Sequence, residues 1–170
     1  MGILLAKFSP EYIIRIIGLD NSGKTTILYR LKGDQSSIST VSTNGFNLET
    51  IQCMNKNLVI WDIGGHRNVR NLYRHYYPQS HALIFVVDAS DHQRIDEMKD
   101  EFAEVLKCSE GVPTVLILNK QDKENAMTES FIKEQLKLDD IKDRKWFVQL
   151  TSALNSESNS SLLQWLSNNI

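Results

Sequence analysis

The stretch GLDNSGKTT, residues 18–26, lies between an apolar run, YIIRII at 12–17, and a segment with helical spacing. It fits the pattern G-x-x-x-x-G-K-[ST], whose defining positions are held by Gly18, Gly23, Lys24 and Thr25. This spacing lets successive backbone N–H groups surround a phosphate, with the partial positive charge of a helix N-terminus behind them. The pattern alone also fits a plain glycine turn before a helix. Between a strand and a helix it predicts a nucleotide phosphate site, the phosphate cradle (residues 18–26), in which Lys24 reaches the outer phosphates and Thr25 binds magnesium.

Short apolar runs alternate with longer amphipathic segments along the rest of the chain. Continuous apolar runs suit strands that are buried on both faces of a parallel sheet, whereas the alternating FNLETIQC suits an edge strand. We predict a turn at Asn55–Asn57 and a helix stop at Gly33. The order predicts an α/β fold, with a doubly wound, mostly parallel six-stranded sheet, one antiparallel edge strand and helices on both faces. The predicted strands are 12–17, 46–53, 58–63, 82–87, 113–118 and 146–150, and the predicted helices are 23–32, 68–77, 94–107, 130–137 and 161–170.

The composition is that of one soluble globular domain, with 24% charged and 41% hydrophobic residues among 170. Lys and Arg number 19 against 21 Asp and Glu, so the net charge of -2 gives no indication of a nucleic-acid surface. Cys53 and Cys108 lack the spacing of a zinc site, and no apolar run approaches the roughly 20 residues of a membrane span. We therefore expect a cytoplasmic protein that binds no nucleic acid.

The tetrapeptide NKQD, Asn119–Asp122, follows the predicted strand at 113–118, where open α/β sheets bind their ligands. The Asp122 carboxylate can accept from the ring N–H and the exocyclic amine of guanine, and adenine presents no such pair of donors. Lys120 would lie along the base, and Asn119 would brace neighbouring loops. Alone, NKQD is a polar turn by chance more often than not, so the prediction of guanine depends on the cradle upstream. Ser152 and Ala153, in TSA at 151–153, are weaker candidates for a backbone N–H to the guanine carbonyl.

With GLDNSGKTTIL, WDIGG, RHYY, VVDASD and NKQD in this order, the sequence resembles the Arf and Arf-like small GTPases over essentially its whole length. Leucine and aspartate inside the cradle, and Trp61 before the Asp-x-Gly-Gly turn, distinguish it from Ras-like and Rab-like sequences. The resemblance implies a P-loop GTPase domain at 12–170 that binds GTP or GDP with Mg²⁺ and hydrolyses GTP slowly. It also implies a monomeric switch, served by an exchange factor and a GTPase-activating protein, that recruits effector proteins to membranes in vesicle traffic.

The resemblance also assigns site residues. Thr43 matches the threonine that binds Mg²⁺ only when the γ-phosphate is present, and Asp62 matches the aspartate that holds Mg²⁺ through water. Gly65 matches the glycine whose N–H meets the γ-phosphate, so it joins Lys24 in the catalytic set. Three residues match the aromatic trio offered to effectors, although their residue types alone favour core packing: Phe46, Trp61 and Tyr76. The remaining nucleotide contacts are expected from Asp20, Asn21, Ser22, Gly23, Thr25 and Thr26.

Three departures from the family pattern bear on function. His66 stands where most Arf-like proteins carry the glutamine that orients the attacking water, although the related Sar GTPases resemble this chain in having Gly-Gly-His. Ser42 and Asn44 replace the proline and the apolar residue usual beside Thr43. Thr43 ends DQSSISTVST (34–43), a run of small hydroxyl residues that could equally be a plain loop. LNSESNSS (154–161) replaces a turn that usually contains glycine. Arginine is absent from 34–43, and we expect a solvated helix face or a partner contact for Arg67, Arg70 and Arg74.

The N-terminus MGILLAKF places Gly2 at the position of N-acylation. The strict acylation motif wants Ser or Thr where this chain has Ala6. On a short helix the apolar residues Ile3, Leu4, Leu5 and Phe8 gather on one side. We expect residues 1–11 to attach the protein peripherally to endomembranes, the Golgi or a related compartment. The alternative is a frayed terminus whose apolar residues tuck into the domain.

Two other functions share parts of these motifs. A scaffold that holds guanine nucleotide without useful hydrolysis needs the same cradle, so only measured turnover separates it from a switch. A P-loop kinase that phosphorylates a small molecule also needs the cradle, but this chain has neither an arginine-rich lid nor a substrate-sized insertion. NKQD would also be unexplained in a kinase.

Overall fold

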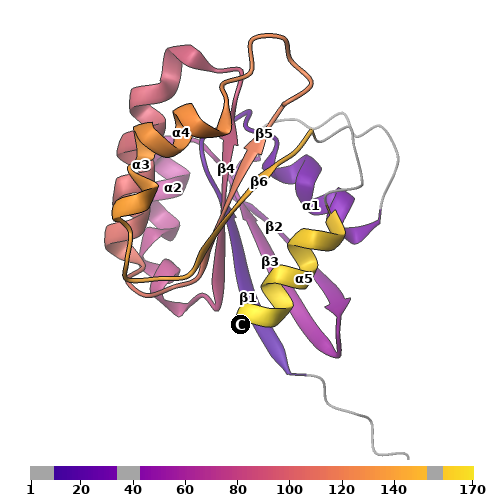
Figure 1. Cartoon of the computed structure of the whole chain (residues 1–170). Coiled ribbons are helices and arrows are strands. Elements are labelled where there is room, and N and C mark those ends of the chain that lie inside the picture. The colour runs from indigo at the N-terminus through magenta and orange to yellow at the C-terminus, as the bar shows by residue number, and fades with distance from the viewer. Residues whose placement is uncertain (1–9, 34–42, 153–158) are drawn as a thin grey trace, which may run out of the picture.

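The computed structural model describes residues 10–33, 43–152 and 159–170. Within them, one six-stranded sheet of order β2-β3-β1-β4-β5-β6 carries helices on both faces (Figure 1). The strands are β1 (Glu11–Ile17), β2 (Phe46–Cys53), β3 (Lys56–Ile63), β4 (Ala82–Asp88), β5 (Thr114–Asn119) and β6 (Trp146–Leu150). The α-helices are α1 (Lys24–Lys32), α2 (Arg67–Tyr73), α3 (Ile95–Cys108), α4 (Glu129–Leu136) and α5 (Asn159–Asn169).

The pairing of the strands confirms the predicted topology. β1 runs parallel to β3 and β4, and β5 runs parallel to β4 and β6. β2 pairs antiparallel with β3, from Phe46 opposite Ile63 to Cys53 opposite Lys56. β2 lies at the edge of the sheet, as its alternating sequence predicts. Its side chains alternate in exposure, but the more exposed positions include the apolar Phe46 and Leu48.

Successive residues of the central strands enter two separate hydrophobic cores. Leu83, Phe85 and Val87 of β4 pack in a core with residues of α3 and α4, whereas Ala82, Ile84 and Val86 pack in a core with residues of α1 and α5. In Figure 1, α2, α3 and α4 cover one face of the sheet, and α1 and α5 cover the other. Because neighbouring strand residues point to opposite faces, a strand covered on both sides is apolar at nearly every position.

The hairpin between β2 and β3 turns one residue earlier than Asn55–Asn57, the turn predicted from the sequence. Met54 and Asn55 form the turn, and both have left-handed backbones, with φ of 48° and 62°. Two successive residues with positive φ match the right-handed twist of the flanking strands. Lys56 already pairs with Cys53, so it belongs to β3.

The segment predicted as one helix at 68–77 forms two elements. α2 ends at Tyr73, and a 3-10 segment, η1 (Arg74–Gln79), follows it. Pro78 lies inside η1. Proline has no N–H to donate, and in an α-helix its ring would collide with the carbonyl four residues earlier, which favours the tighter winding. The fully buried Tyr77 anchors η1 in the core.

The other helices match their predicted ranges within two residues, and Gly33 ends α1 with a left-handed φ of 92°. Helix α5 begins at Asn159, inside the polar stretch that the sequence assigns to a loop. None of the described helices combines the length and the apolar character needed to cross a membrane.

Arg15 is a buried charged residue on β1. Arg15 is 6% exposed, its Nη1 donates to the hydroxyl of Ser80 at 2.6 Å, and its guanidinium lies 5.8 Å from the centre of the Tyr76 ring. Among the described residues it forms no ion pair with a carboxylate. Burial lowers the pKa of Arg15 below its ordinary value. Burying the Arg15 guanidinium therefore costs more free energy than burying an apolar side chain at the same position.

Candidate nucleotide-binding site

The phosphate cradle connects the carboxyl end of β1 to the amino end of α1. Lys24 is the first residue of α1 and is buried. Its ammonium donates to the carbonyl of Leu19 at 2.8 Å, and the hydroxyl of Ser22 donates to the same oxygen at 2.9 Å. Burial lowers the pKa of Lys24 to about 8, and nearby Asp62 and Asp20 act in the opposite direction. A buried cation in a loop that opens a helix is an anion-binding arrangement.

Gly23 brings the cradle against the predicted guanine-binding loop. Its φ is 94°, and a Cβ at this position would lie 2.2 Å from the amide nitrogen of Asn119. Asn119 is fully buried at the end of β5, and its Nδ2 donates to the carbonyl of Ser22 at 2.8 Å. This bond confirms the prediction that Asn119 braces neighbouring loops. It also explains why residue 23 is glycine, since any side chain would displace Asn119.

Oxygen atoms from three separate parts of the chain meet at Thr25. Its Oγ1 donates to Oδ2 of Asp62 at 2.5 Å and lies 3.0 Å from Oγ1 of Thr43. Asn47 donates to the same carboxylate oxygen of Asp62 at 3.0 Å. The second carboxylate oxygen, Oδ1, is buried and has no hydrogen-bond partner among the described residues.

This set of oxygen atoms fits a magnesium ion. Mg²⁺ prefers oxygen ligands, takes one or two carboxylates from a protein, and keeps several waters or phosphate oxygens. Thr25 and Thr43 offer hydroxyls, and the unpartnered Oδ1 of Asp62 leaves an acceptor for a metal-bound water. An ion held here would neutralise negative charge on phosphate oxygens in the cradle.

The turn Gly64–Gly65–His66 lies against the cradle. A Cβ on Gly65 would lie 2.1 Å from the backbone nitrogen of Asp20, so the two backbones are in direct contact and no side chain fits between them. His66 follows as the N-cap of α2, is exposed, and makes no side-chain capping bond. Its ring is near enough to Asp20 for their charges to interact. The structure therefore brings His66 to the edge of the predicted phosphate site with its ring open to solvent.

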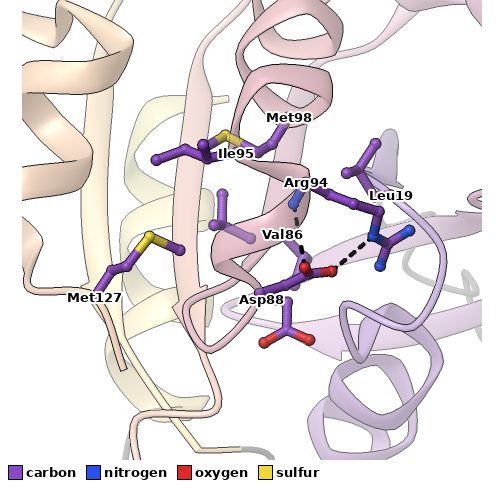
Figure 2. A pocket seen from close by; sticks show the side chains of 9 residues that line it. Leu19, Val86, Asp88, Arg94, Ile95, Met98 and Met127 are labelled. Carbon is purple, nitrogen blue, oxygen red and sulfur yellow. Dashed lines mark hydrogen bonds and ion pairs between the residues drawn. The ribbon is translucent and has the colours of Figure 1, made fainter. Parts of the chain in front are cut away.

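A small hollow lies beside the cradle, between Leu19 and the start of α3 (Figure 2). Its polar lining consists of Asp88, Asp91 and Arg94. The sequence marks both aspartates, in VVDASD, but assigns neither of them nor Arg94 a role. Their partners could not be read from spacing, since Asp88 bonds a lysine 32 positions away and Arg94 bonds an aspartate 74 positions away.

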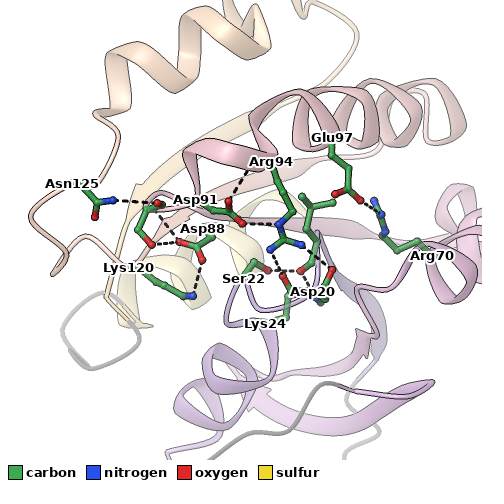
Figure 3. Close-up of polar contacts among 12 residues, drawn as sticks. Asp20, Ser22, Lys24, Arg70, Asp88, Asp91, Arg94, Glu97, Lys120 and Asn125 are labelled. Atoms are coloured by element: carbon green, nitrogen blue, oxygen red, sulfur yellow. Dashed lines mark hydrogen bonds and ion pairs between the residues drawn. The ribbon is translucent and has the colours of Figure 1, made fainter.

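The predicted guanine side is held by a row of polar contacts (Figure 3). Lys120 has a left-handed backbone, with φ of 64°, and its ammonium donates to Oδ2 of Asp88 at 2.6 Å. Oδ1 of Asp88 accepts from the backbone N–H and the hydroxyl of Ser90. Burial alone would raise the pKa of Asp88, but the hydrogen bonds from Lys120 and Ser90 hold it below its usual value. Asp88 therefore stays ionised and keeps Lys120 in place.

Asp122, the predicted guanine acceptor, is exposed. Its Oδ1 accepts from the hydroxyl of Ser152 at 2.7 Å, and this hydrogen bond holds the pKa of Asp122 below its usual value. Ser152 thus orients an ionised carboxylate at the carboxyl end of the sheet. Of the other predicted contacts, Asn21 is exposed at the tip of the cradle and Thr26 is half-buried in α1. Ala153 and Gly2 lie outside the described residues.

The predicted effector residues lie in a chain of ring contacts. The rings of Phe46 and Trp61 are 4.7 Å apart, and Tyr73 joins Phe46 to Tyr76 with separations of 5.7 and 6.3 Å. Phe46 and Tyr76 are 43% and 40% exposed, whereas Trp61 is half-buried against the core. Leu48 and Leu72 are also exposed. Core packing, the alternative reading of these residue types, therefore describes Trp61 better than Phe46 or Tyr76.

The expectation of a solvated face or partner contact is wrong for two of the three arginines near α2. Arg70 is buried and pairs with Glu97 at 2.7 Å and with Glu101 at 2.6 Å. Arg74 pairs with Glu101 at 2.8 Å, and Glu101 itself is buried. Arg67 is exposed. Ion pairs to α3 therefore fasten α2 and η1, and their carboxylates lie too far along the chain for local spacing to indicate them.

Comparison with known proteins agrees with this arrangement. The model of the ADP-ribosylation factor family matches residues 3–170. ADP-ribosylation factor J of Dictyostelium discoideum is 45% identical over 163 residues, which cover 94% of this chain and 86% of the relative. ADP-ribosylation factor K of the same organism is 43% identical over 160 residues, which cover 92% of this chain and 84% of the relative.

A solved structure leads to the same family. The Arl6 BBS3 small GTPase from Trypanosoma brucei, with the bound nucleotide analogue GppNp, matches with a TM-score of 0.82 and 31% identity, over 93% of this chain and 96% of that one. The match confirms the P-loop GTPase fold. The chain belongs to the ADP-ribosylation factor (Arf) family, and it is a small GTPase that binds GTP and GDP with Mg²⁺ and hydrolyses GTP.

Proposed function

We propose that this protein is a membrane-attached switch that hydrolyses GTP slowly and, in its GTP form, recruits effectors in vesicle traffic on Golgi or related membranes. The strongest support is the contact of Thr43 with Thr25, at 3.0 Å. Thr43 stands three positions before Phe46, where the predicted effector surface begins on β2. An Mg²⁺ contact of Thr43 that requires the γ-phosphate would therefore couple the bound nucleotide to the position of that surface.

For hydrolysis we assign one role to each of three residues. Lys24 binds the outer phosphates, the N–H of Gly65 donates to the γ-phosphate, and His66 accepts a hydrogen bond from the attacking water. The water oxygen bonds to the γ-phosphorus as the bond to GDP breaks, which yields GDP and inorganic phosphate. Residues 34–43 contain no arginine. The intrinsic rate of GTP hydrolysis should therefore be slow, on the order of 10⁻⁴ s⁻¹ or below, until an activating protein supplies an arginine.

The membrane part of the proposal rests on the sequence of residues 1–11. A single myristoyl chain on Gly2 binds a bilayer only marginally, so a second signal is needed. Ile3, Leu4 and Leu5 supply apolar side chains for that signal. Co-sedimentation of the N-myristoylated protein with liposomes tests the idea. We expect more protein in the pellet with a non-hydrolysable GTP analogue than with GDP, and Gly2→Ala should remain in the supernatant with both. Equal pelleting of the two nucleotide forms contradicts the coupling.

The effector part of the proposal rests on the exposed rings of Phe46 and Tyr76. Losing one aromatic residue at the centre of an interface costs on the order of 2 kcal/mol or more. Tyr76→Ala should therefore lose the proteins captured by the GTP-locked wild type in a pull-down, while its affinity for GDP survives. Leu150→Ala is the matched control, since Leu150 is also exposed but lies on β6, at the opposite edge of the sheet. Loss of GDP binding or of folding in Tyr76→Ala would assign this residue to the core.

A second candidate function is a nucleotide-holding scaffold with little hydrolysis. The observation in its favour is the exposed ring of His66, which makes no hydrogen bond within the part of the chain that the structure describes. Single-turnover hydrolysis with and without an Arf-family activating protein separates the candidates. An activator should accelerate a switch, whereas a scaffold would stay at the intrinsic rate.

A further inference from the structure

Arg94 ends a 3-10 segment, η2 (His92–Arg94), directly before α3, and bonds both Asp91 and Asp20. Its Nε donates to Oδ2 of Asp91 at 2.6 Å, and its backbone N–H donates to the other oxygen of that carboxylate at 3.3 Å. Nη1 donates to Oδ1 of Asp20 at 2.9 Å, and Nη2 donates to the backbone carbonyl of Asp20 at 3.0 Å. Figure 3 shows the guanidinium between the two aspartates. Asp91 thus orients Arg94, and both terminal nitrogens bond the cradle.

Asp20 is an acidic residue within a loop that binds phosphate. Its backbone touches Gly65, and its charge acts on Lys24, the cation that would meet the outer phosphates. Burial alone would raise the pKa of Asp20, but Arg94 holds it below its usual value, so the carboxylate is ionised. An uncompensated carboxylate here would repel the nucleotide phosphates and compete with them for Lys24.

We propose that Arg94 is a positioning residue for nucleotide binding, which holds the Asp20 carboxylate toward α3 and compensates its charge so that the cradle accepts phosphate. Lys24 then donates to the carbonyl of Leu19 rather than to Asp20. The proposal rests on the assignment of residues 18–26 as the phosphate site. It does not depend on His66, the effector surface or membrane attachment.

A purely mechanical role for Arg94 makes a different prediction. The bond from Nη2 to the backbone carbonyl of Asp20 could brace the cradle whatever the charge of the Asp20 side chain. In that case Arg94→Ala would weaken nucleotide binding equally with aspartate or asparagine at position 20. Compensation of charge instead predicts that Asp20→Asn relieves the defect of Arg94→Ala.

The experiment measures the dissociation rate and Kd of fluorescent GDP with Mg²⁺ for the wild type, Arg94→Ala, Asp20→Asn and the double variant. We expect Arg94→Ala to release GDP on the order of 10- to 100-fold faster, since the negative charge of Asp20 in the phosphate cradle becomes uncompensated. Asp20→Asn alone should release GDP more slowly than the wild type, because it removes a negative charge while Arg94 remains. The double variant should recover most of the loss. Arg94→Lys keeps the positive charge but loses the planar set of guanidinium N–H donors. Its GDP release rate should fall between those of Arg94→Ala and the wild type.

Arg144→Ala is the matched control. Arg144 also uses several nitrogens, bonding Asp143, the hydroxyl of Ser109 and the carbonyl of Leu106, but it does so at the C-terminal end of α3. It should lower thermal stability without faster release of GDP. A double variant as weak as Arg94→Ala, or an Arg94→Ala protein with wild-type release, overturns the proposal. Failure of the wild type to bind GDP would instead overturn the assignment of the cradle itself. If Arg94→Ala does not fold, Arg94→Lys with and without Asp20→Asn answers the same question.

Discussion

The guanine side and the γ-phosphate side of the nucleotide site differ in how their side chains are held. Asn119, Lys120 and Asp122 each bond another part of the chain through the side chain, at 2.8, 2.6 and 2.7 Å. The ring of His66 is exposed and makes no hydrogen bond among the described residues. Rejection of a wrong base requires acceptors that are already in place, whereas a partner can supply groups that stabilise a transition state. Under the proposed function, base selection is built into this chain, whereas hydrolysis needs a group that an activating protein supplies.

Reversing one hydrogen-bonding group on the guanine side should have the largest effect. Asp122→Asn should weaken GTP binding about 100-fold or more, because an amide N–H would face the donors of guanine. The same variant should gain affinity for xanthosine triphosphate, whose edge is complementary to the amide. Competition of both nucleotides against fluorescent GDP measures the change.

Ser152→Ala provides the matched control for Asp122→Asn, since it removes the hydroxyl that orients the carboxylate but leaves the carboxylate itself. We expect less than about a tenfold loss of GTP affinity and no gain for xanthine nucleotide. Unchanged GTP affinity in Asp122→Asn would remove Asp122 from the base site. The guanine side would then lack its proposed base-selecting acceptor.

Replacing His66 should affect hydrolysis while GTP binding persists. His66→Leu should lose activator-stimulated hydrolysis by about 100-fold, the usual contribution of one positioned acid or base group, and His66→Gln should retain it.

Single-turnover hydrolysis with and without activator checks the role of His66. Equal stimulated rates in wild type and His66→Leu would leave His66 without a catalytic role. The γ-phosphate side would then differ from the guanine side in function as well as in bonding.

The smallest expected effect tests the packing of β1 against η1. Arg15 is a buried cation that bonds Ser80 and faces Tyr76 but pairs with no carboxylate among the described residues. Arg15→Met should raise the free energy of unfolding by about 1 kcal/mol, or Tm by about 2–4 °C, because an apolar side chain of similar length needs no solvation. Thermal unfolding with GDP bound measures it. Arg144→Met, which removes a well-bonded arginine, should lower Tm, and a lower Tm in Arg15→Met would show that Arg15 supports the fold.

Most of the fold could be predicted from the sequence because hydrophobic periodicity is local. The edge strands β2 and β6 have the residue ranges that their apolar patterns predict. The errors arose where tertiary or backbone effects override that pattern. The turn at Met54 and Asn55 depends on two left-handed residues that are not glycine, and the helix at 68–77 is divided because Pro78 favours 3-10 winding.

The candidate site was predictable where a motif encodes a backbone geometry, as in the cradle and in Asn119. Arg94 and Glu101 were missed because their functions depend on partners 74 and 27 positions away. No local spacing reports such a pair, and an arginine near a helix start usually reads as a solvated residue. The long-range ion pairs that support the phosphate loop and α2 therefore emerged only from the fold.

The contact between Gly23 and Asn119 limits how this sequence can diverge. A Cβ at position 23 would lie 2.2 Å from the Asn119 amide, and that amide carries the bond to Ser22. A substitution at Gly23 would therefore displace Asn119 in the guanine loop. Loss of the Asn119 amide would remove the hydrogen bond that holds the phosphate cradle at Ser22. A sequence that changes Gly23 or Asn119 alone would have an impaired nucleotide pocket. The phosphate cradle and NKQD should therefore change together or not at all. Directed evolution toward a different base should accordingly keep Gly23 and Asn119 constant and randomise Asp122 and Ser152.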